Sequence, residues 1–283
     1  SMNYCFLFLT VATLTAQEVF TKQYSTKKTA GAVTYAALVS ISALCMFVLS
    51  SGFKFRFRQE LLGYVLLFTA AYCAATVFLT LAMGCGPLSL TSLIHSYSLM
   101  IPTLYGILFL HEKLRVSMCI GMALLVLSLA LINYAKSDRK KNVRWLLYVF
   151  VAFMGNGLCS TVQKAQQVAF GGQYKNEFMI VSLAGVSVIL LICSLFLERK
   201  QLLSSIRRGW YLAVPCGILN GLTNLFVLLL STKIAASLMF PILSGGNVVL
   251  TSLISVWGFH EKLNRRQLAG IALGVASIIL LSL

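Results

Sequence analysis

Long apolar stretches follow one another along almost the whole chain, and this pattern most constrains what it can fold into. A helix needs about 20 apolar residues to cross the hydrocarbon core of a bilayer. The sequence predicts ten such helices, joined by connections too short for an extramembrane domain, and therefore an all-α polytopic membrane protein. The approximate ranges are 3–23, 30–51, 60–82, 87–110, 115–135, 143–166, 176–197, 209–231, 234–257 and 264–283.

The composition supports this fold class and excludes others. Of the 283 residues 59% are hydrophobic and 11% are charged, whereas a soluble domain carries about 25% charged residues. The net charge of +16 lies mostly in short loops such as Arg139-Lys140-Lys141, where basic residues meet anionic headgroups. We expect membrane lipids as partners, no nucleic acid, and a multi-pass location in the inner or plasma membrane.

Motifs for enzymatic chemistry are absent from the sequence. It holds no P-loop, no H-E-x-x-H, no G-x-S-x-G and no metal-spaced cluster of His and carboxylates. The eight cysteines form no C-x-x-C pair, and almost all lie within apolar runs, where a thiol behaves as a small hydrophobe. We therefore expect no enzyme, no cofactor, no metal and no disulfide framework.

One stretch occurs twice and relates the two halves of the chain. An apolar run ends in His111-Glu112-Lys113-Leu114, and another ends in His260-Glu261-Lys262-Leu263. Four identities follow both at a constant offset: Gly121 with Gly270, Ala123 with Ala272, Val126 with Val275, and Ser128 with Ser277. The sequence predicts a first five-helix repeat over 1–135, a basic loop over 136–143 and a second repeat over 144–283.

The odd number of helices in each repeat predicts that the two repeats are inverted. The second repeat then enters the membrane from the side opposite to the first, as in many secondary transporters that bind their substrate near the midplane. With a cytoplasmic amino terminus, most Lys and Arg residues would lie in outer loops. The positive-inside rule therefore favours the opposite orientation.

Polar residues within apolar spans are costly, and they identify the candidate site. Glu18 is the one carboxylate well inside a predicted span. Two interpretations stay open: a proton- or cation-coupling group in a cavity, or a helix-end charge that reaches the headgroups or pairs with Lys22. The other candidates for substrate contact are Gln17, Tyr72, Thr76, His95, Tyr97, Asn156, Ser160, Gln163, Asn220, Asn224, Ser244 and Asn247. For isolated hydroxyls, interhelical hydrogen bonding is the simpler interpretation.

His95 is the second candidate for proton coupling, beside Glu18. At the repeat offset His95-Ser96-Tyr97-Ser98 matches Ser244-Gly245-Gly246-Asn247, and both segments lie near the middle of a span. Histidine can change its charge near neutral pH. A neutral histidine bonded to a neighbouring helix is the alternative.

The segment Ser244–Leu281 resembles the closing half of the drug/metabolite transporter superfamily. The resemblance lies in Ser-Gly-x-x-x-Val-Leu-x-Ser-Leu, then Trp257-Gly258-Phe259, then Glu261-Lys262-Leu263 and a glycine-rich last helix. With two such halves, the chain is similar to the EamA-type permeases. The same segment also resembles the single-copy small multidrug resistance proteins.

The resemblance implies cytoplasmic termini, transport by alternating access and a central cavity. The cavity would be lined by the spans 3–23, 60–82, 87–110, 143–166, 209–231 and 234–257. In the small multidrug resistance family, a glutamate of the first helix couples protons to substrate.

The predicted function is a secondary transporter for small neutral, zwitterionic or cationic metabolites, with amino-acid-like solutes and export favoured. No Lys or Arg lies deep in the spans, so an anionic phosphate ester would lack partners. The first alternative is a proton-coupled multidrug or hydrophobic-cation exporter, and the second is a non-transporting membrane scaffold. A small solute and possible protons are the expected partners, and monomer and dimer both stay open.

Overall fold

The computed structural model describes residues 2–27, 31–113, 116–134, 143–260 and 264–282. This part of the chain consists of α-helices and one short 3-10 helix, with no β-strand among the described residues. The elements are α1 (Met2–Ser25), α2 (Ala32–Ser50), η1 (Gln59–Leu61), α3 (Leu62–Cys85), α4 (Leu88–Tyr97), α5 (Met100–Phe109), α6 (Val116–Tyr134), α7 (Val143–Ala169), α8 (Lys175–Leu197), α9 (Leu202–Ser231), α10 (Ala236–Phe259) and α11 (Arg265–Ser282). The all-helical fold class is confirmed.

Eight segments of the described chain are long and apolar enough to cross a membrane, and Thr91–Phe109 covers α4 and α5 together. Two further apolar segments are shorter, Cys119–Ser128 in α6 and Leu268–Ser277 in α11. Large apolar side chains face outwards, with Phe196 83% and Trp257 77% exposed. Because such a surface suits lipid tails and not water, the chain is a multi-pass membrane protein. The count of ten crossings stays a prediction.

The predicted helix 87–110 is divided into α4 and α5, which corrects the sequence prediction. Pro102 has no N–H and leaves the carbonyl of Ser98 without its helical i+4 partner. The N–H of Ile101 bonds this carbonyl at 3.0 Å, and the N–H of Ser98 bonds the carbonyl of His95 at 3.1 Å. These i+3 bonds form a tight turn, so α4 ends shortly after His95.

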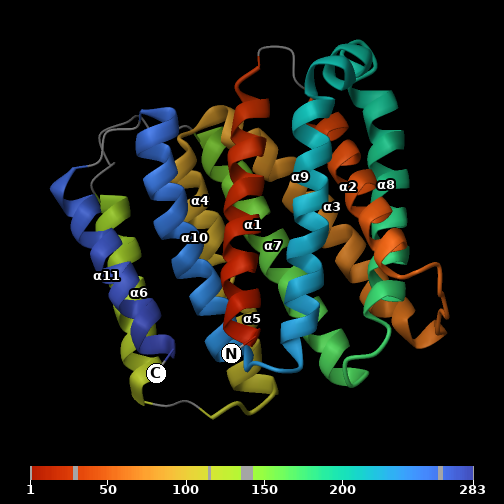
Figure 1. The fold of residues 1–283 in the computed structure, drawn as a ribbon. Coiled ribbons are helices and arrows are strands. Elements are labelled where there is room, and N and C mark those ends of the chain that lie inside the picture. The colour runs from red at the N-terminus through yellow and green to blue at the C-terminus, as the bar shows by residue number, and fades with distance from the viewer. Residues whose placement is uncertain (1, 28–30, 114–115, 135–142, 261–263, 283) are drawn as a thin grey trace.

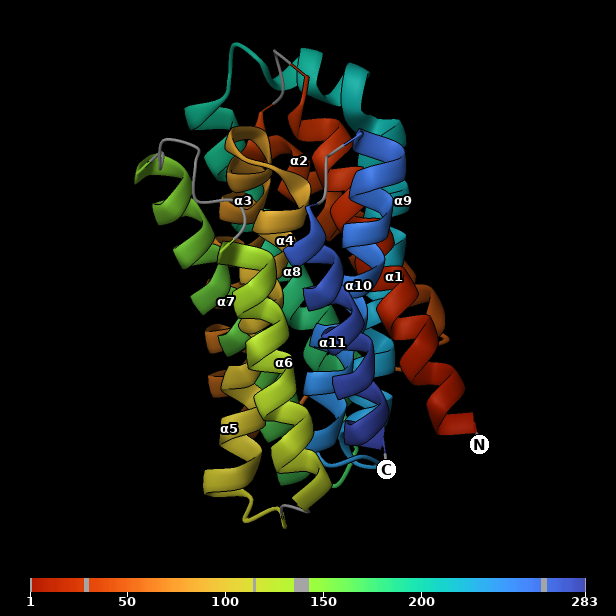
Figure 2. The same ribbon diagram turned by 90° about the vertical axis from the view of Figure 1, so that its left-hand side faces the viewer.

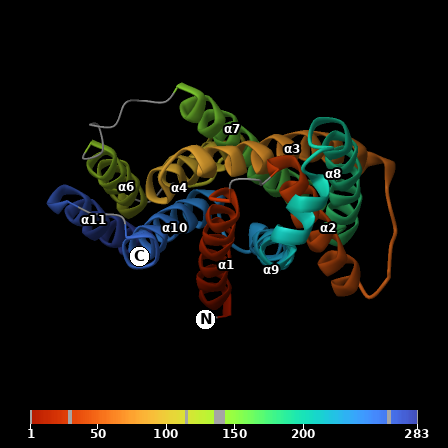
Figure 3. The ribbon, with the colours of Figure 1, turned by 90° about the horizontal axis from the view of Figure 1, so that it is seen from above.

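Helix α1 lies between two groups of helices (Figure 1). α10 and α4 pack on one side of it and α9 on the other, while α2, α3 and α8 extend the second group. α6 packs against α11 at the edge, and α7 packs against α3. Seen from above, α1 and α7 lie on opposite sides of the middle of the molecule (Figure 3). The start of α1 and the end of α11 lie at the same end of the molecule (Figure 2).

Two apolar clusters hold these helices together. The larger one joins α2, α3 and α8 and buries Phe47, Phe68 and Phe178 completely. The second joins α1, α9 and α10 through residues such as Leu7 and Phe240. Dispersion contacts of this kind, rather than hydrophobic transfer, bind helices to one another within a bilayer.

Two lysines satisfy the carboxyl ends of long helices. Lys22 Nζ donates to the carbonyl oxygens of Met83 at 2.8 Å and Gly86 at 2.6 Å, at the end of α3. Lys164 Nζ donates to the carbonyl oxygen of Ser231 at 2.6 Å, at the end of α9. The last carbonyls of a helix lack intrahelical partners, and a cation there also complements the helix dipole. The two lysines, one in each half of the chain, thus make the same kind of contact.

The repeated tetrapeptide begins at a left-handed residue after a helix. His111 and His260 have φ angles of 51° and 52°, which turn the chain sharply away from α5 and α10. Glu112 then accepts hydrogen bonds from the first two N–H groups of α10, both at 2.8 Å. A carboxylate is favourable at this positive end of the helix dipole. The first copy therefore joins the end of α5 to the start of α10, and residues 261–263 of the second copy lie outside the described residues.

Replacing Lys164 by Met should lower the free energy of unfolding by about 3 kcal/mol, the cost of breaking one partner of a buried ion pair. The side chain is 3% exposed, and its Nζ lies 3.7 Å from Glu112 Oε1. Thermal unfolding in detergent measures the effect, with the exposed neighbour Lys233→Met as control. Equal melting temperatures for the two variants would contradict this role.

Candidate functional site

A cavity lies in the middle of the helix bundle. Its lining comes from α1, α2, α3, α4, α7, α9 and α10, with Leu99 between α4 and α5. The space free of protein atoms is about 1070 Å³, including the part open to the outside. All six spans that we expected to line a cavity contribute residues to its lining. Helix α2, which was not expected there, adds Tyr35, Ala36 and Val39.

Most of the candidate residues from the sequence meet at this cavity. The lining includes Gln17, Glu18, Tyr72, Thr76, His95, Asn156, Ser160, Gln163, Asn220, Asn224 and Asn247. They come from six helices in both halves of the chain, so the fold gathers polar residues that are far apart in the sequence. Their contact with a substrate stays a prediction.

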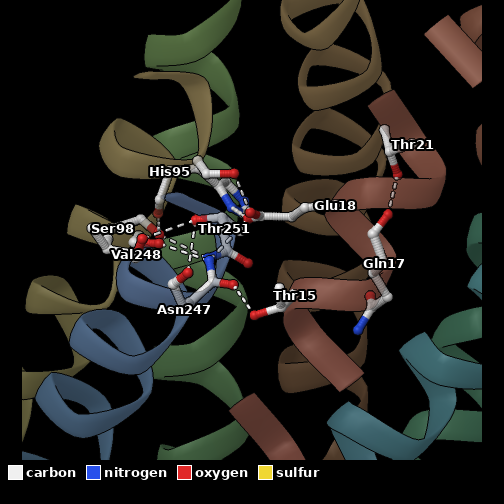
Figure 4. A network of polar contacts seen from close by, with 12 residues as sticks. Thr15, Gln17, Glu18, Thr21, His95, Ser98, Asn247, Val248 and Thr251 are labelled. Atoms are coloured by element: carbon white, nitrogen blue, oxygen red, sulfur yellow. Dashed lines mark hydrogen bonds and ion pairs between the residues drawn. The ribbon is translucent and has the colours of Figure 1, made fainter. Parts of the chain in front are cut away.

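Glu18 lies at the centre of a network between α1, α4 and α10 (Figure 4). The residue is 1% exposed. Its Oε1 lies 3.0 Å from Nδ1 of His95 and accepts a hydrogen bond from Nδ2 of Asn247 at 3.2 Å. Ser92 Oγ donates to the other carboxylate oxygen. The fold thus brings together Glu18 and His95, the two candidates for proton coupling, and adds Asn247 from the other half of the chain.

The alternative interpretation of Glu18 as a helix-end charge at the headgroups is wrong. The carboxylate is buried and faces α4 and α10. Lys22 lies one helical turn further on and donates its hydrogen bonds to the end of α3. Spacing along one helix could not decide this, because the choice depends on which helices pack against it.

Neutral side chains from α1, α3, α7 and α9 form a second network. Asn220 is its centre: its Nδ2 donates to Gln17 Oε1 at 2.8 Å, and its Oδ1 accepts from Tyr72 OH at 2.6 Å. Asn224 Nδ2 donates to the same Oδ1 at 2.9 Å. Gln163 Nε2 extends the network from α7 with a 2.7 Å bond to Asn224 Oδ1. These side chains therefore connect helices and line the cavity at once.

Tyr97 and Ser244, which the sequence also favoured, do not line the cavity. Tyr97 is half-buried and packs beside Leu93, Val248 and Ile271, between α4, α10 and α11. Ser244 is completely buried, and its Oγ donates to the carbonyl oxygen of Ser96 at 2.8 Å. Successive residues of a helix point about 100° apart, so the cavity position in α4 belongs to Ser96 and not to Tyr97.

Three network residues were missed by the sequence analysis. Ser92 and Ser96 stand three residues before and one after His95, and Thr15 stands three before Glu18. Residues three or four apart share a helix face, so the spacing of Ser92 from His95 and of Thr15 from Glu18 was a usable signal, whereas no such spacing relates Ser96 to His95. Thr15 Oγ1 donates to Asn247 Oδ1 at 2.9 Å, and Asn247 Nδ2 donates to Ser96 Oγ at 2.8 Å.

The charge of the cavity is concentrated in one network. Glu18 is the one carboxylate in the lining, His95 is the one histidine, and no Lys or Arg is part of it. Gln17 and Glu18 are neighbours in α1 but point to different networks (Figure 4). Among the described residues no three His, Cys, Asp or Glu side chains gather as metal ligands would. The lining thus presents a carboxylate–histidine pair on one side and neutral amides and hydroxyls on the other.

The fold and cavity define a class: a multi-pass helical membrane protein with a buried polar site. No protein-family model matches the chain. The multidrug resistance protein EbrA of Bacillus licheniformis is 39% identical over 74 residues, which are 26% of this chain and 70% of EbrA. By this match the chain belongs to the family of that small multidrug resistance protein, and this part of the resemblance is confirmed. The EamA-type assignment stays a prediction.

The whole chain also shares its fold with a protein of known crystal structure. The TM-score is 0.76, and the match covers 100% of this chain and 97% of the other at 13% identity. At this identity the likeness concerns the fold alone. The shared fold therefore covers both halves of the chain and is not limited to the segment that matches EbrA.

Asn220→Leu should destabilise the protein more than Tyr72→Phe. The Leu variant removes one side-chain hydrogen bond each from Gln17, Tyr72 and Asn224, whereas the Phe variant removes a single interhelical bond, worth about 0.6 kcal/mol. Thermal unfolding of both variants in the same detergent measures the difference. If Tyr72→Phe lowered the melting temperature as much as Asn220→Leu, Asn220 would not be the centre of the network.

Proposed function

We propose that this protein is a secondary transporter that binds small positively charged solutes in the central cavity and moves them by alternating access. The observation that carries the proposal is Glu18, a buried carboxylate in a lining without Lys or Arg. An ionisable group within a membrane is expensive and is retained for a function. A low-dielectric cavity with one negative group attracts cations and repels anions.

The chemistry of the lining favours cationic solutes over the amino-acid-like solutes that the sequence favoured. A solute carboxylate is best held by Arg or Lys, and neither lines the cavity. The rings of Tyr35, Tyr72 and Phe240 are part of the lining, and aromatic faces attract organic cations. The relative EbrA is named a multidrug resistance protein, which agrees with this class. Amino-acid-like solutes stay the second candidate, for which the amide network would supply hydrogen bonds.

Inverted repeats would supply the alternating access. Three features support them: the corresponding helix-end contacts of Lys22 and Lys164, the left-handed His111 and His260, and the packing of α3 on α7 and α1 on α9. In an inverted-repeat protein, a contact between helices of different halves has an equivalent made by their counterparts, and the contacts of α3 with α7 and of α1 with α9 form such a pair. If each repeat adopted the conformation of the other, the cavity would close on one side of the membrane and open on the other.

We infer export driven by protons as the direction of transport, in the inner or plasma membrane. A proton held in the cavity beside Glu18 and a cationic solute exclude one another, so the inward flow of one can drive the outward flow of the other. This exchange needs the charged site at Glu18 and the change of access.

Tetraphenylphosphonium should raise the melting temperature of the purified protein, because a ligand bound by the folded state alone stabilises it. Tetraphenylborate, which has the same shape and the opposite charge, should not. Glu18→Gln should weaken tetraphenylphosphonium binding by about tenfold or more, the equivalent of 1.4 kcal/mol. Melting curves at several ligand concentrations measure these affinities.

The control for this experiment is Glu60→Gln, which removes an exposed carboxylate whose side chain is 63% exposed. It should leave the effect of tetraphenylphosphonium unchanged. Stabilisation by both ions, or by neither, would contradict a cation site at Glu18. Proton-driven accumulation of the cation in proteoliposomes, measured against Glu18→Gln vesicles, separates a transporter from a membrane scaffold.

Single cysteines at His111 and His260 should be labelled from opposite sides of the membrane. Inversion of the repeats makes α5 and α10 run in opposite directions, and these histidines follow the ends of the two helices. The measurement uses a membrane-impermeant maleimide on oriented vesicles, in a background without the eight native cysteines. Labelling of both positions from one side would contradict the inverted repeats.

A further inference from the structure

The carboxylate of Glu18 is surrounded by hydrogen-bond donors. Ser92 Oγ donates to Oε2, Asn247 Nδ2 donates to Oε1, and His95 Nδ1 lies 3.0 Å from Oε1. An ionised carboxylate accepts hydrogen bonds and donates none, whereas a protonated one must also donate. The arrangement therefore suits an ionised Glu18 to which His95 Nδ1 contributes an N–H.

The amide of Asn247 is held in the orientation that suits an ionised Glu18. Thr15 Oγ1 donates to Asn247 Oδ1 at 2.9 Å, which leaves the amide nitrogen to face the carboxylate. The same nitrogen donates to Ser96 Oγ at 2.8 Å. Thr15 of α1 thus orients the Asn247 amide of α10 towards Glu18 (Figure 4). Helix α4 contributes the Ser92 hydroxyl and the His95 imidazole.

An ionised Glu18 in this position needs a positive partner. The residue is 1% exposed and His95 is 6% exposed, and a lone carboxylate removed from water is far more costly than one that is paired. No Lys or Arg is part of the cavity lining. His95 is therefore the lining residue that can supply the charge.

The other titratable groups near this pair come from the helices around it. In the cavity lining α10 contributes no titratable side chain, and the remaining helices contribute Tyr35 from α2, Tyr72 from α3, Cys159 from α7 and Cys216 from α9. Phenol and thiol groups become negative when they lose a proton, so none of them can act as the cation.

We propose that protonated His95 is the internal counter-ion of Glu18 in the empty cavity, and that an incoming cationic solute displaces it. His95 then loses its proton, and Glu18 pairs with the solute instead. The step balances, since one positive charge enters the cavity as the solute and one leaves as the proton. This inference rests on the proposed cation transport and assigns the exchanged proton to the imidazole rather than to Glu18.

The second nitrogen of the imidazole offers the exit for this proton. Among the described residues no side chain or carbonyl bonds Nε2 of His95, and the ring contacts Glu18 through Nδ1. His95 is part of the cavity lining, so water in the cavity can take a proton from Nε2 while Nδ1 keeps its hydrogen bond to Glu18. A neutral imidazole with its proton on Nδ1 is the product of that transfer.

Nuclear magnetic resonance of protein labelled with ¹⁵N-histidine tests the assignment at neutral pH. The chain has three histidines, and the signals missing from His95→Gln identify His95. In the empty protein both ring nitrogens of His95 should carry protons. Saturation with tetraphenylphosphonium should convert them to one protonated and one unprotonated nitrogen.

Glu18→Gln supplies a test that needs no ligand. Without the carboxylate, His95 should lose its imidazolium signal in the empty protein, while exposed His111 and His260 should keep their spectra. A neutral His95 in the empty wild-type protein would overturn the proposal, as would an imidazolium unaffected by Glu18→Gln. Failure of tetraphenylphosphonium to bind would instead contradict the proposed function, and the ligand-free comparison would still decide the charge of His95.

Discussion

A carboxylate buried among apolar helices has to be satisfied by its neighbours, and the centre of this protein is built around that requirement. Glu18 obtains its partners from Ser92 and His95 of α4 and from Asn247 of α10. Because Asn247 belongs to the second half of the chain, the full set of partners forms only when both halves are packed together. The polar site therefore depends on the tertiary fold, and the fold loses a stabilising contact if the site is altered.

The same physical constraint applies at the helix ends. In an apolar environment, terminal backbone groups that lack intrahelical partners need side chains to bond them. Lys22 and Lys164 supply donors to carbonyl ends, and Glu112 supplies an acceptor to the N-terminus of α10. The first copy of the repeated tetrapeptide thus has a structural role, because its Glu112 joins the end of α5 to the start of α10. The candidate site lies deeper within the helix bundle, where the polar networks meet.

The two networks have different consequences for a solute. The amides and hydroxyls around Asn220 are uncharged and can exchange one hydrogen-bond partner for another at small cost. The pair of Glu18 and His95 is charged in our proposal, and its separation by a solute changes the charge of the site. A transporter needs both properties, adaptable contacts for the body of the solute and one group that couples its binding to a proton.

The sequence by itself determined the membrane-spanning helical fold class, because an apolar run of sufficient length has few alternatives to a helix in lipid. It also singled out Glu18, His95 and the Asn and Gln residues, since polar groups in such runs are rare. Helix periodicity alone could not show which neighbours surround each face. Only the tertiary structure decided that Glu18 faces His95 and Asn247 rather than the membrane surface. It also showed that Ser96 and not Tyr97 lines the cavity and that Pro102 divides the predicted helix 87–110, because these outcomes depend on packing and backbone bonds between distant segments.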